Sequence, residues 1–322
     1  LHANVYSTLP NVELVGLADK DINKKELGDK YKTKFYNDYF DLLKSDVEAI
    51  SVCLPDRNHV QTCCDVADSK KHILVEKPIA HDFISAKKII DNCKKNNVRL
   101  MVGHILRFDP RCVHLYENTK KEDIGELIHV RAKRATIIDV ANRLGSNSSI
   151  LYYLGVHDID LIQWISRADI ISVYAKKVEK HNNGNEDSLY AILELENGAI
   201  GMLDYSWSWP GAFPSGYNFN LEALGTKSGT FIDVRDQGIW KVTNENLNSF
   251  DTLFWTNELT ISLIFRTLFM ITWSIIVGSP YGSQLLPSHI FVGDTFAFTN
   301  SANRNIAIIK NFPLLILLSL TD

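Results

Sequence analysis

The amino-acid sequence predicts an α/β fold with a parallel sheet, followed by an α+β domain with an open, mainly antiparallel sheet. The first observation is that short apolar runs and polar helical stretches alternate over residues 12–104. Such runs are typical of strands buried on both faces of a parallel sheet, and the alternation is typical of a doubly wound sheet. The second observation is that long strand patterns follow one another after Arg107, with few helical stretches between them.

The parallel sheet is expected to contain four strands with three helices between them. The predicted strands are VELVGLA (12–18), EAISVCL (48–54), HILVEK (72–77) and VRLMVGH (98–104). The predicted helices are NKKELGDKYK (23–32), HVQTCCDVADSKK (59–71) and SAKKIIDNCKKNN (85–97).

The second domain is expected to begin with a helix over residues 109–124 and a strand over residues 126–135. Two long strands then cover residues 188–209, and Asn197-Gly198 joins them, because this dipeptide favours a type I′ hairpin turn. A similar pattern surrounds residues 225–229. Long antiparallel strands with few helices indicate an open sheet.

The charge pattern changes near residue 258. Residues 261–322 hold five charged side chains, whereas 22% of the whole chain is charged. We therefore predict a first domain over residues 1–105, a second over residues 106–258, and an atypical apolar tail over residues 259–322. A gene fragment with a cut start, whose reading frame slips near residue 258, would explain this tail and the absence of Met at position 1.

Composition excludes several classes of protein. The chain has 322 residues, which is enough for two domains. Its 34 basic and 38 acidic residues give no general electrostatic case for binding nucleic acid or an anionic membrane surface. The five cysteines lack the spacing of a zinc or redox site, so we predict no metal site and a cytoplasmic protein with reduced thiols. The start of the chain shows no signal-peptide pattern.

One segment has the length of a membrane-spanning helix. LTISLIFRTLFMITWSIIV (259–277) is apolar apart from Arg266. An arginine near the centre of a bilayer costs about 2.5–3.5 kcal/mol on insertion scales. We therefore expect no membrane insertion, with a membrane-attached protein as the rival interpretation.

Asp19 ends the first predicted strand. In a dinucleotide-binding fold, an acid at such a position accepts hydrogen bonds from the adenosine ribose, but it could equally cap the following helical turn. The glycine fingerprint GxGxxG should lie about 20 residues upstream of this acid, and the sequence does not contain it. Either the fold binds no dinucleotide, or the segment with the glycines is missing and residues 1–322 bind NAD(H) weakly or not at all.

Polar residues also follow the next two predicted strands. Pro55 and Asn58 suit a loop at the carboxyl end of a strand, where ligands bind in open α/β sheets, and His59 could cap a helix instead. Glu76 and Lys77 end a buried strand, and the proline after them prevents a helix from continuing. Charges at such a place often mark only a solvated boundary, but the Lys-Pro pair favours a functional site.

The stretch LYYLGVHDIDLIQWI (151–165) predicts a helix that starts near Val156 and carries His157 and Asp160 on one face. The positive end of the helix dipole disfavours an imidazolium in the first turn, whereas Asp158 and Asp160 favour it. A lone histidine at such a place is more often structural. A histidine with an aspartate three residues on is a better catalytic candidate.

Three motifs, in this order, resemble the glucose–fructose oxidoreductase/inositol dehydrogenase (Gfo/Idh/MocA) family. They are VEKPIA (75–80), GHILRFDPR (103–111) and LGVHDIDLIQWI (154–165), and EALGTKSGTFID and DTLFW downstream are also similar. The resemblance covers about residues 1–258. It implies a Rossmann domain, then a domain whose open sheet covers the active site and often mediates oligomerisation, so a homo-oligomer is expected. It also implies NAD(P)-dependent oxidation or reduction of a sugar, cyclitol or related polyol.

The resemblance also implies roles for individual residues. Lys77 matches the lysine that contacts substrate and nicotinamide, and His157 matches the histidine that exchanges a proton with the reacting hydroxyl. The residues implied to contact substrate are Arg107, Tyr153 and Asp160. Those implied to bind the cofactor are Asp19, Pro55, Asn58, His59, Glu76 and Lys77.

The sequence departs from the family at several points. Many members have an aspartate four residues before the catalytic histidine, and this chain has Tyr153, so the proton relay is shorter or Tyr153 contacts substrate. The closing helix and strand of the family are not recognisable after about Glu258. Asp19 favours NAD, although Lys20 could accept the 2′-phosphate of NADP. An inactive fragment, or a binding or regulatory protein of the same fold, is the alternative.

Overall fold

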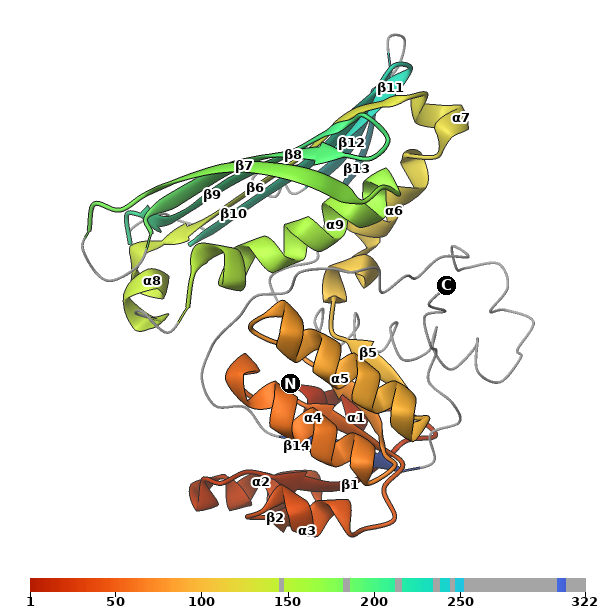
Figure 1. Cartoon of the computed structure of the whole chain (residues 1–322), viewed down its shortest axis with the longest axis vertical. Coiled ribbons are helices and arrows are strands. Elements are labelled where there is room, and N and C mark those ends of the chain that lie inside the picture. Colours follow the sequence, from red (N-terminus) through yellow and green to blue (C-terminus); the bar gives the residue numbers. More distant parts are fainter. Residues whose placement is uncertain are drawn as a thin grey trace. The chain divides into compact units, whose positions relative to one another are not determined.

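The computed structural model describes residues 1–144, 148–181, 186–211, 216–233, 238–243, 247–251 and 306–310. The chain forms two compact units (Figure 1). The first unit contains the described residues 1–105 and 306–310, and the second contains the described residues between 106 and 251.

The first unit is built on a six-stranded sheet in the order β2-β1-β14-β3-β4-β5. The strands are β1 (Glu13–Ala18), β2 (Lys34–Tyr36), β3 (Ala49–Val52), β4 (His72–Val75), β5 (Leu100–Val102) and β14 (Ile306–Lys310). β1 and β2 pair in parallel, as do β3, β4 and β5. The predicted parallel sheet and its four strands are therefore confirmed.

Strand β14 lies between β1 and β3 and runs antiparallel to both. The sequence does not predict this strand, because the apolar run Ile306–Ile309 is short and lies within the stretch that is expected to be an atypical tail. β14 pairs the edges of β1 and β3, which would otherwise be open. The rest of the tail, including the apolar segment 259–277, lies outside the described residues.

The helices of the first unit are short apart from α4 and α5, which pack against each other. Their bounds are α1 (His2–Tyr6), α2 (Glu26–Tyr31), α3 (Tyr39–Leu43), α4 (His59–Asp68) and α5 (Phe83–Asn96), with 3₁₀ turns η1 (Ile22–Lys25) and η2 (Asp56–Asn58). A third 3₁₀ turn, η3 (Ile105–Phe108), contains the residues at which the second unit begins. α5 begins where the Asp82 carboxylate accepts a hydrogen bond from the Ser85 N–H, and ends where Asn97 adopts a left-handed conformation.

The second unit is built on an eight-stranded sheet in the order β13-β12-β11-β10-β6-β9-β8-β7. The strands are β6 (Leu127–Ile137), β7 (Ile170–Val178), β8 (Ser188–Leu195), β9 (Ile200–Trp209), β10 (Tyr217–Gly225), β11 (Ser228–Asp233), β12 (Gly238–Thr243) and β13 (Leu247–Asp251). Neighbours are antiparallel except β6 and β9. Residues 196–199 join β8 to β9, which confirms the predicted hairpin. The predicted type I′ turn is wrong, because Gly198 has a positive φ of 82° but Asn197 does not, and a type I′ turn requires both.

Helices cover one face of this sheet, as Figure 1 shows for α6 (Pro110–Asn118) and α9 (Val156–Ser166). α7 (Lys121–Ile124), α8 (Ile138–Leu144) and a π-helical turn, η5 (Leu151–Gly155), complete the unit. Tyr116 of α6 stacks on Trp164 of α9, with ring centroids 4.2 Å apart. Leu161 and Ile162 of α9 lie in the core between helices and sheet. Within the described residues, none of the helices combines the length and the apolar character that crossing a bilayer requires.

Candidate active site

The carboxyl ends of β1, β3 and β4 lie at one edge of the first-unit sheet, because these three strands share one direction. The predicted cofactor residues follow these ends. Asp19 follows β1, and one of its carboxylate oxygens accepts a hydrogen bond from the Asp21 N–H at 2.9 Å. Pro55 precedes turn η2 after β3, and the exposed Asn58 is the last residue of this turn. The structure therefore places the predicted cofactor residues at the edge where open α/β sheets bind ligands.

His59 is buried and joins two loops of this edge. Its Nδ1 lies 2.9 Å from the carbonyl oxygen of Pro78, and its Nε2 lies 2.8 Å from that of Leu54. Burial lowers the pKa of His59, so the ring is neutral at neutral pH and donates to one carbonyl at a time. The imidazole therefore holds the loop after β3 against the turn after β4.

Glu76 and Lys77 form the turn after β4, and the Lys77–Pro78 peptide bond is cis. The Glu76 carboxylate accepts hydrogen bonds from His2 Nε2 at 2.9 Å and from the Lys77 N–H at 3.2 Å. His2 Nδ1 lies 3.0 Å from the Ser51 hydroxyl, which also bonds Tyr6. Nothing in the sequence pattern indicates that His2 takes part in this site.

Burial alone would lower the pKa of His2, but Cys53 and the hydrogen bond to Glu76 raise this pKa well above its usual value. This direction favours the imidazolium, so His2 and the partly buried Glu76 form an ion pair beside Lys77.

His157 stands in the first turn of α9, and the two aspartates that follow it are each paired with an arginine. Asp160 receives two hydrogen bonds from Arg107, at 2.9 Å and 2.7 Å. Asp158 receives two from Arg134, at 2.6 Å and 2.8 Å. The structure thus joins Arg107 and Asp160, two of the three predicted substrate residues, to each other.

The sequence does not single out Arg134, which lies on the helix-facing side of β6 and is 4% exposed. Its guanidinium also donates to the Tyr217 hydroxyl and lies 4.1 Å from the Phe219 ring centroid. Burial alone would lower the pKa of Arg134, but the Asp158 carboxylate raises it. The inward periodicity of β6 is the one sequence signal that could have identified it.

Tyr153 lies in the π-helical turn that precedes α9, and π-helical turns occur often at functional sites. Its ring centroid lies 6.4 Å from that of Trp207, whose indole N–H donates to the carbonyl oxygen of Glu186. The Glu186 carboxylate accepts a hydrogen bond from the Ile150 N–H at 2.5 Å. The start of this turn is therefore attached to the segment that precedes β8.

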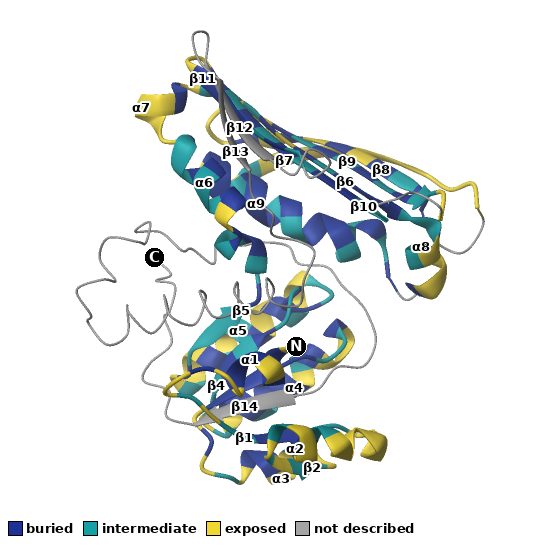
Figure 2. Cartoon of the chain, turned by 180° about the vertical axis from the view of Figure 1, so that it is seen from behind, coloured by how far each residue is buried: buried dark blue, intermediate teal, exposed yellow. Residues whose placement is uncertain are grey.

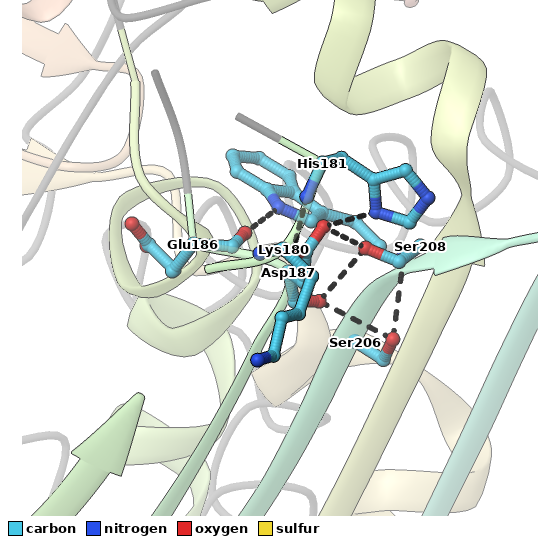
Figure 3. Close-up of polar contacts among 7 residues, drawn as sticks. Lys180, His181, Glu186, Asp187, Ser206 and Ser208 are labelled. Carbon is cyan, nitrogen blue, oxygen red and sulfur yellow. Dashed lines mark hydrogen bonds and ion pairs between the residues drawn. The ribbon is translucent and has the colours of Figure 1, made fainter. Parts of the chain in front are cut away.

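Asp187, next to Glu186, is a centre of hydrogen bonds (Figure 3). Its carboxylate accepts from the Ser208 hydroxyl at 2.7 Å and contacts His181 Nδ1 at 2.6 Å. The backbone N–H groups of Lys180 and His181 also donate to it. These bonds fix the ends of the connection between β7 and β8.

Across the described ranges, histidine, cysteine, aspartate and glutamate side chains nowhere gather in a group of three that could hold a metal ion. The described chemistry comprises a lysine and an ion pair at the sheet edge of the first unit, and a half-buried histidine on a clamped helix in the second. An ammonium and an imidazole suit electrostatic stabilisation and proton transfer.

Comparison with known proteins gives two matching family models. A Gfo/Idh/MocA model, described as oxidoreductase family with an NAD-binding Rossmann fold, matches residues 1–104. The Gfo/Idh/MocA C-terminal domain matches residues 114–230.

Similar individual proteins are also oxidoreductases by name. An uncharacterised oxidoreductase of Bacillus subtilis, YrbE, is 26% identical over 243 residues, which cover 72% of this chain and 70% of that protein. The myo-inositol 2-dehydrogenase of Thermotoga maritima is 26% identical over 245 residues, covering 72% and 71%. GenD2 from gentamicin A biosynthesis, solved with NAD, shares the fold with a TM-score of 0.72 and 23% identity, covering 87% of this chain and 83% of that one.

Proposed function

Because the chain belongs to the Gfo/Idh/MocA family of NAD-binding oxidoreductases, we propose that it transfers a hydride between NAD and a secondary hydroxyl of a sugar, cyclitol or related polyol. The observation that carries the proposal is the first turn of α9, where Asp158 and Asp160, just after His157, are each held by an arginine. Lys77 at the ligand edge of the first sheet supports it. The similarity to a myo-inositol 2-dehydrogenase supports a polyol as the substrate.

The residues present fit the two ends of a dinucleotide. Asp19 offers a carboxylate to the adenosine ribose at the end of β1, and Glu76 and Lys77 lie at the end of β4 for the nicotinamide. The sequence holds no GxGxxG turn for the pyrophosphate. We favour NAD over NADP because the Asp19 carboxylate suits ribose hydroxyls and would repel a 2′-phosphate.

Each protein group has a distinct role in the proposed reaction. Bound NAD supplies the acceptor for the hydride. His157 takes the hydroxyl proton as the C–H bond breaks, because loss of the hydride alone would leave a protonated ketone. The Lys77 ammonium suits stabilisation of the negative charge that develops as the hydroxyl is oxidised. Arg107 and Asp160 fix the first turn of α9 through their pairing, and Tyr153 contacts the substrate.

The test measures NADH or NADPH formation by residues 1–322 with myo-inositol, scyllo-inositol and free hexoses. We expect NAD-dependent oxidation of at least one polyol only at high NAD concentration, because residues 1–322 lack the GxGxxG turn and should bind NAD weakly. His157→Gln and Lys77→Met should each lower kcat about 10²- to 10⁴-fold, the usual contribution of a proton-transferring group. The exposed residues His181 and Lys95 provide matched controls, and His181→Gln and Lys95→Met should leave kcat unchanged. Full activity of His157→Gln would refute the proposed role.

A binding or regulatory protein of the same fold is the second candidate. The absence of a GxGxxG turn from the sequence favours it, because pyrophosphate binding relies on that turn. Calorimetry separates the two candidates. A polyol that binds to the chain without turnover, with either cofactor, would support the second candidate and contradict the first.

We also propose that the chain assembles as a homo-oligomer through the helix-free face of the second-unit sheet. Tyr174 of β7, Ile192 of β8 and Met202 of β9 are opposite one another in register, so their side chains share this face. Tyr174 is 69% exposed and Ile192 is 51% exposed. Figure 2 shows that exposed residues run along β7. A row of exposed apolar side chains on a sheet is typical of a surface that another subunit covers.

A further inference from the structure

The ion pair between Arg134 and Asp158 connects the helix that carries His157 to the middle of the second-unit sheet. Asp158 follows His157 in α9 and is fully buried. Arg134 lies on β6, which has β9 and β10 as its neighbours in the sheet. Both hydrogen bonds come from one planar guanidinium, which fixes the orientation of the carboxylate as well as its distance.

Arg134 is itself held in place. Tyr217 of β10 accepts a hydrogen bond from its third nitrogen, and Phe219 of the same strand lies against the guanidinium plane. Arg134 and Phe219 are opposite each other in the β6–β10 register. The connection to α9 therefore starts from a guanidinium that the sheet holds on several sides.

The second ion pair fixes the other side of the same helical turn. Asp158 and Asp160 point in directions about 200° apart around the helix axis, because successive residues are about 100° apart. His157 lies on the arc between them. With Asp158 tied to Arg134 and Asp160 tied to Arg107, the first turn of α9 cannot rotate without breaking an ion pair.

We propose that Arg134 is a positioning residue that orients His157 through Asp158. This inference rests on the proposed role of His157 in proton transfer. Stability alone does not account for the pair, because well-packed apolar residues often replace a buried ion pair without loss of stability. An apolar pair packs, but it lacks the two directional bonds that set the angle of the turn.

The experiment uses the whole chain and separates orientation from stability. Arg134→Met leaves Asp158 buried without its partner, so the melting temperature should fall. Arg134→Met/Asp158→Leu removes both charges, so the melting temperature should recover relative to the single variant. In the double variant kcat should stay about tenfold or more below that of the wild type, with the polyol KM within about threefold, because a misplaced catalytic group costs turnover. Arg131→Met, on the opposite face of β6 and exposed, is the matched control and should match the wild type.

A second readout does not depend on activity. In a chain labelled with ¹⁵N-histidine, the His157 ring signals are those that disappear in His157→Gln. They should shift in the double variant and stay unchanged in Arg131→Met. Asp158→Asn, which keeps the side-chain volume, should show a smaller shift in the same sense and replaces the double variant if that one fails to fold.

The inference is overturned if the double variant, or Asp158→Asn in its place, keeps wild-type kcat and unshifted His157 signals. Full activity of His157→Gln refutes the proposed function instead. In that case the ring signals still show whether Arg134 orients His157.

Discussion

Among the described residues of the second unit, Asp109, Asp158 and Asp160 each accept two or more hydrogen bonds from one arginine. Of these three pairs, Asp109–Arg111 is the most deeply buried. The side chains of Asp109 and Arg111 are 0% and 2% exposed. Asp109 also caps α6 by accepting from the Arg111 N–H. A buried charge without its partner is costly, whereas an exposed pair contributes little.

We predict that Arg111→Met lowers the free energy of unfolding by about 3–5 kcal/mol, because Asp109 stays buried without a counter-charge. Denaturant unfolding followed by tryptophan fluorescence measures the change. Arg131→Met removes an exposed arginine from the same unit and should change the value by less than about 0.5 kcal/mol. Equal effects of the two variants would show that burial of the Asp109–Arg111 pair does not determine its contribution to the free energy of unfolding.

The pKa of Asp187 gives a prediction about acid stability. Burial alone would raise this pKa, but hydrogen bonds from Ser208, His181 and two backbone N–H groups lower it to about 2 (Figure 3). A folded-state pKa below the unfolded value of about 3.9 stabilises the fold above that value. The stabilisation is lost as the pH falls toward 2.

Asp187→Asn should therefore have a lower melting temperature than the wild type at pH 5, and the difference should shrink as the pH approaches 2. Calorimetry across this range measures it. Ser206→Ala is the control, because the Ser206 hydroxyl bonds the Asp187 carbonyl oxygen and not the carboxylate, so its effect should not vary with pH. A constant difference between Asp187→Asn and the wild type would contradict the assignment.

Single residues of the candidate site were predictable when their signal was local. His157 and Asp160 are three positions apart on one helix, so spacing indicates both. Arg134 acts on a residue 24 positions away, and His2 acts on Glu76 across 74 positions. The periodicity of a single sequence reports local structure, so it does not indicate contacts between residues so far apart. The catalytic roles of Lys77 and His157 remain predictions.

At the scale of elements, the start of α9 is fixed by the turn that precedes it and by Glu186. The π-helical turn η5 runs directly into α9, and Glu186 accepts the hydrogen bond of the Ile150 N–H at its start. Glu186 is 9% exposed, so water does not replace this bond easily. The segment before β8 thus fixes the start of the helix that carries His157.

Glu186→Ala should lower the free energy of unfolding by about 1.5–3 kcal/mol, the usual contribution of a hydrogen bond to a charged group. It should also lower kcat, because η5 and His157 belong to one continuous helical segment. Denaturant unfolding and steady-state kinetics measure the two effects. Glu179→Ala removes an exposed carboxylate near the end of β7 that pairs with Lys177, and it should alter neither quantity. A wild-type kcat in Glu186→Ala would show that the hydrogen bond of Glu186 does not affect the position of His157.

The elements themselves were predictable to different extents. Long alternating or apolar runs gave β1, β3, β4, β5 and the β8–β9 hairpin, because burial on one or two faces sets the period of the sequence. β2 has three residues and α3 has five, and both lie between polar residues, so no longer run marks them. β5 also has three residues, but it lies within the longer run VRLMVGH. β14 is defined by the two strands beside it, and no local property of the run determines that pairing.

At the scale of the whole molecule, the sheet of the second unit has helices on one face, and its other face carries exposed apolar side chains. β8 alternates strictly between buried and exposed positions, so each buried leucine is matched by an exposed neighbour. A solvated sheet face would usually carry polar residues at these positions. Tyr190, Ile192 and Ile200 are between 45% and 52% exposed. This composition resembles the buried part of a subunit interface.

Ile192→Glu combined with Tyr174→Glu should convert an oligomer of this chain into smaller species, because each buried carboxylate without a partner opposes association. Sedimentation velocity at micromolar concentration measures the change in mass. Val173→Glu provides the matched control. Val173 lies on the same strand and is 63% exposed, but it is opposite the buried Leu193, so its side chain belongs to the helix-covered face. The control should keep the wild-type mass. A wild-type chain that sediments as a monomer, or a double variant with unchanged mass, would contradict assembly through this face.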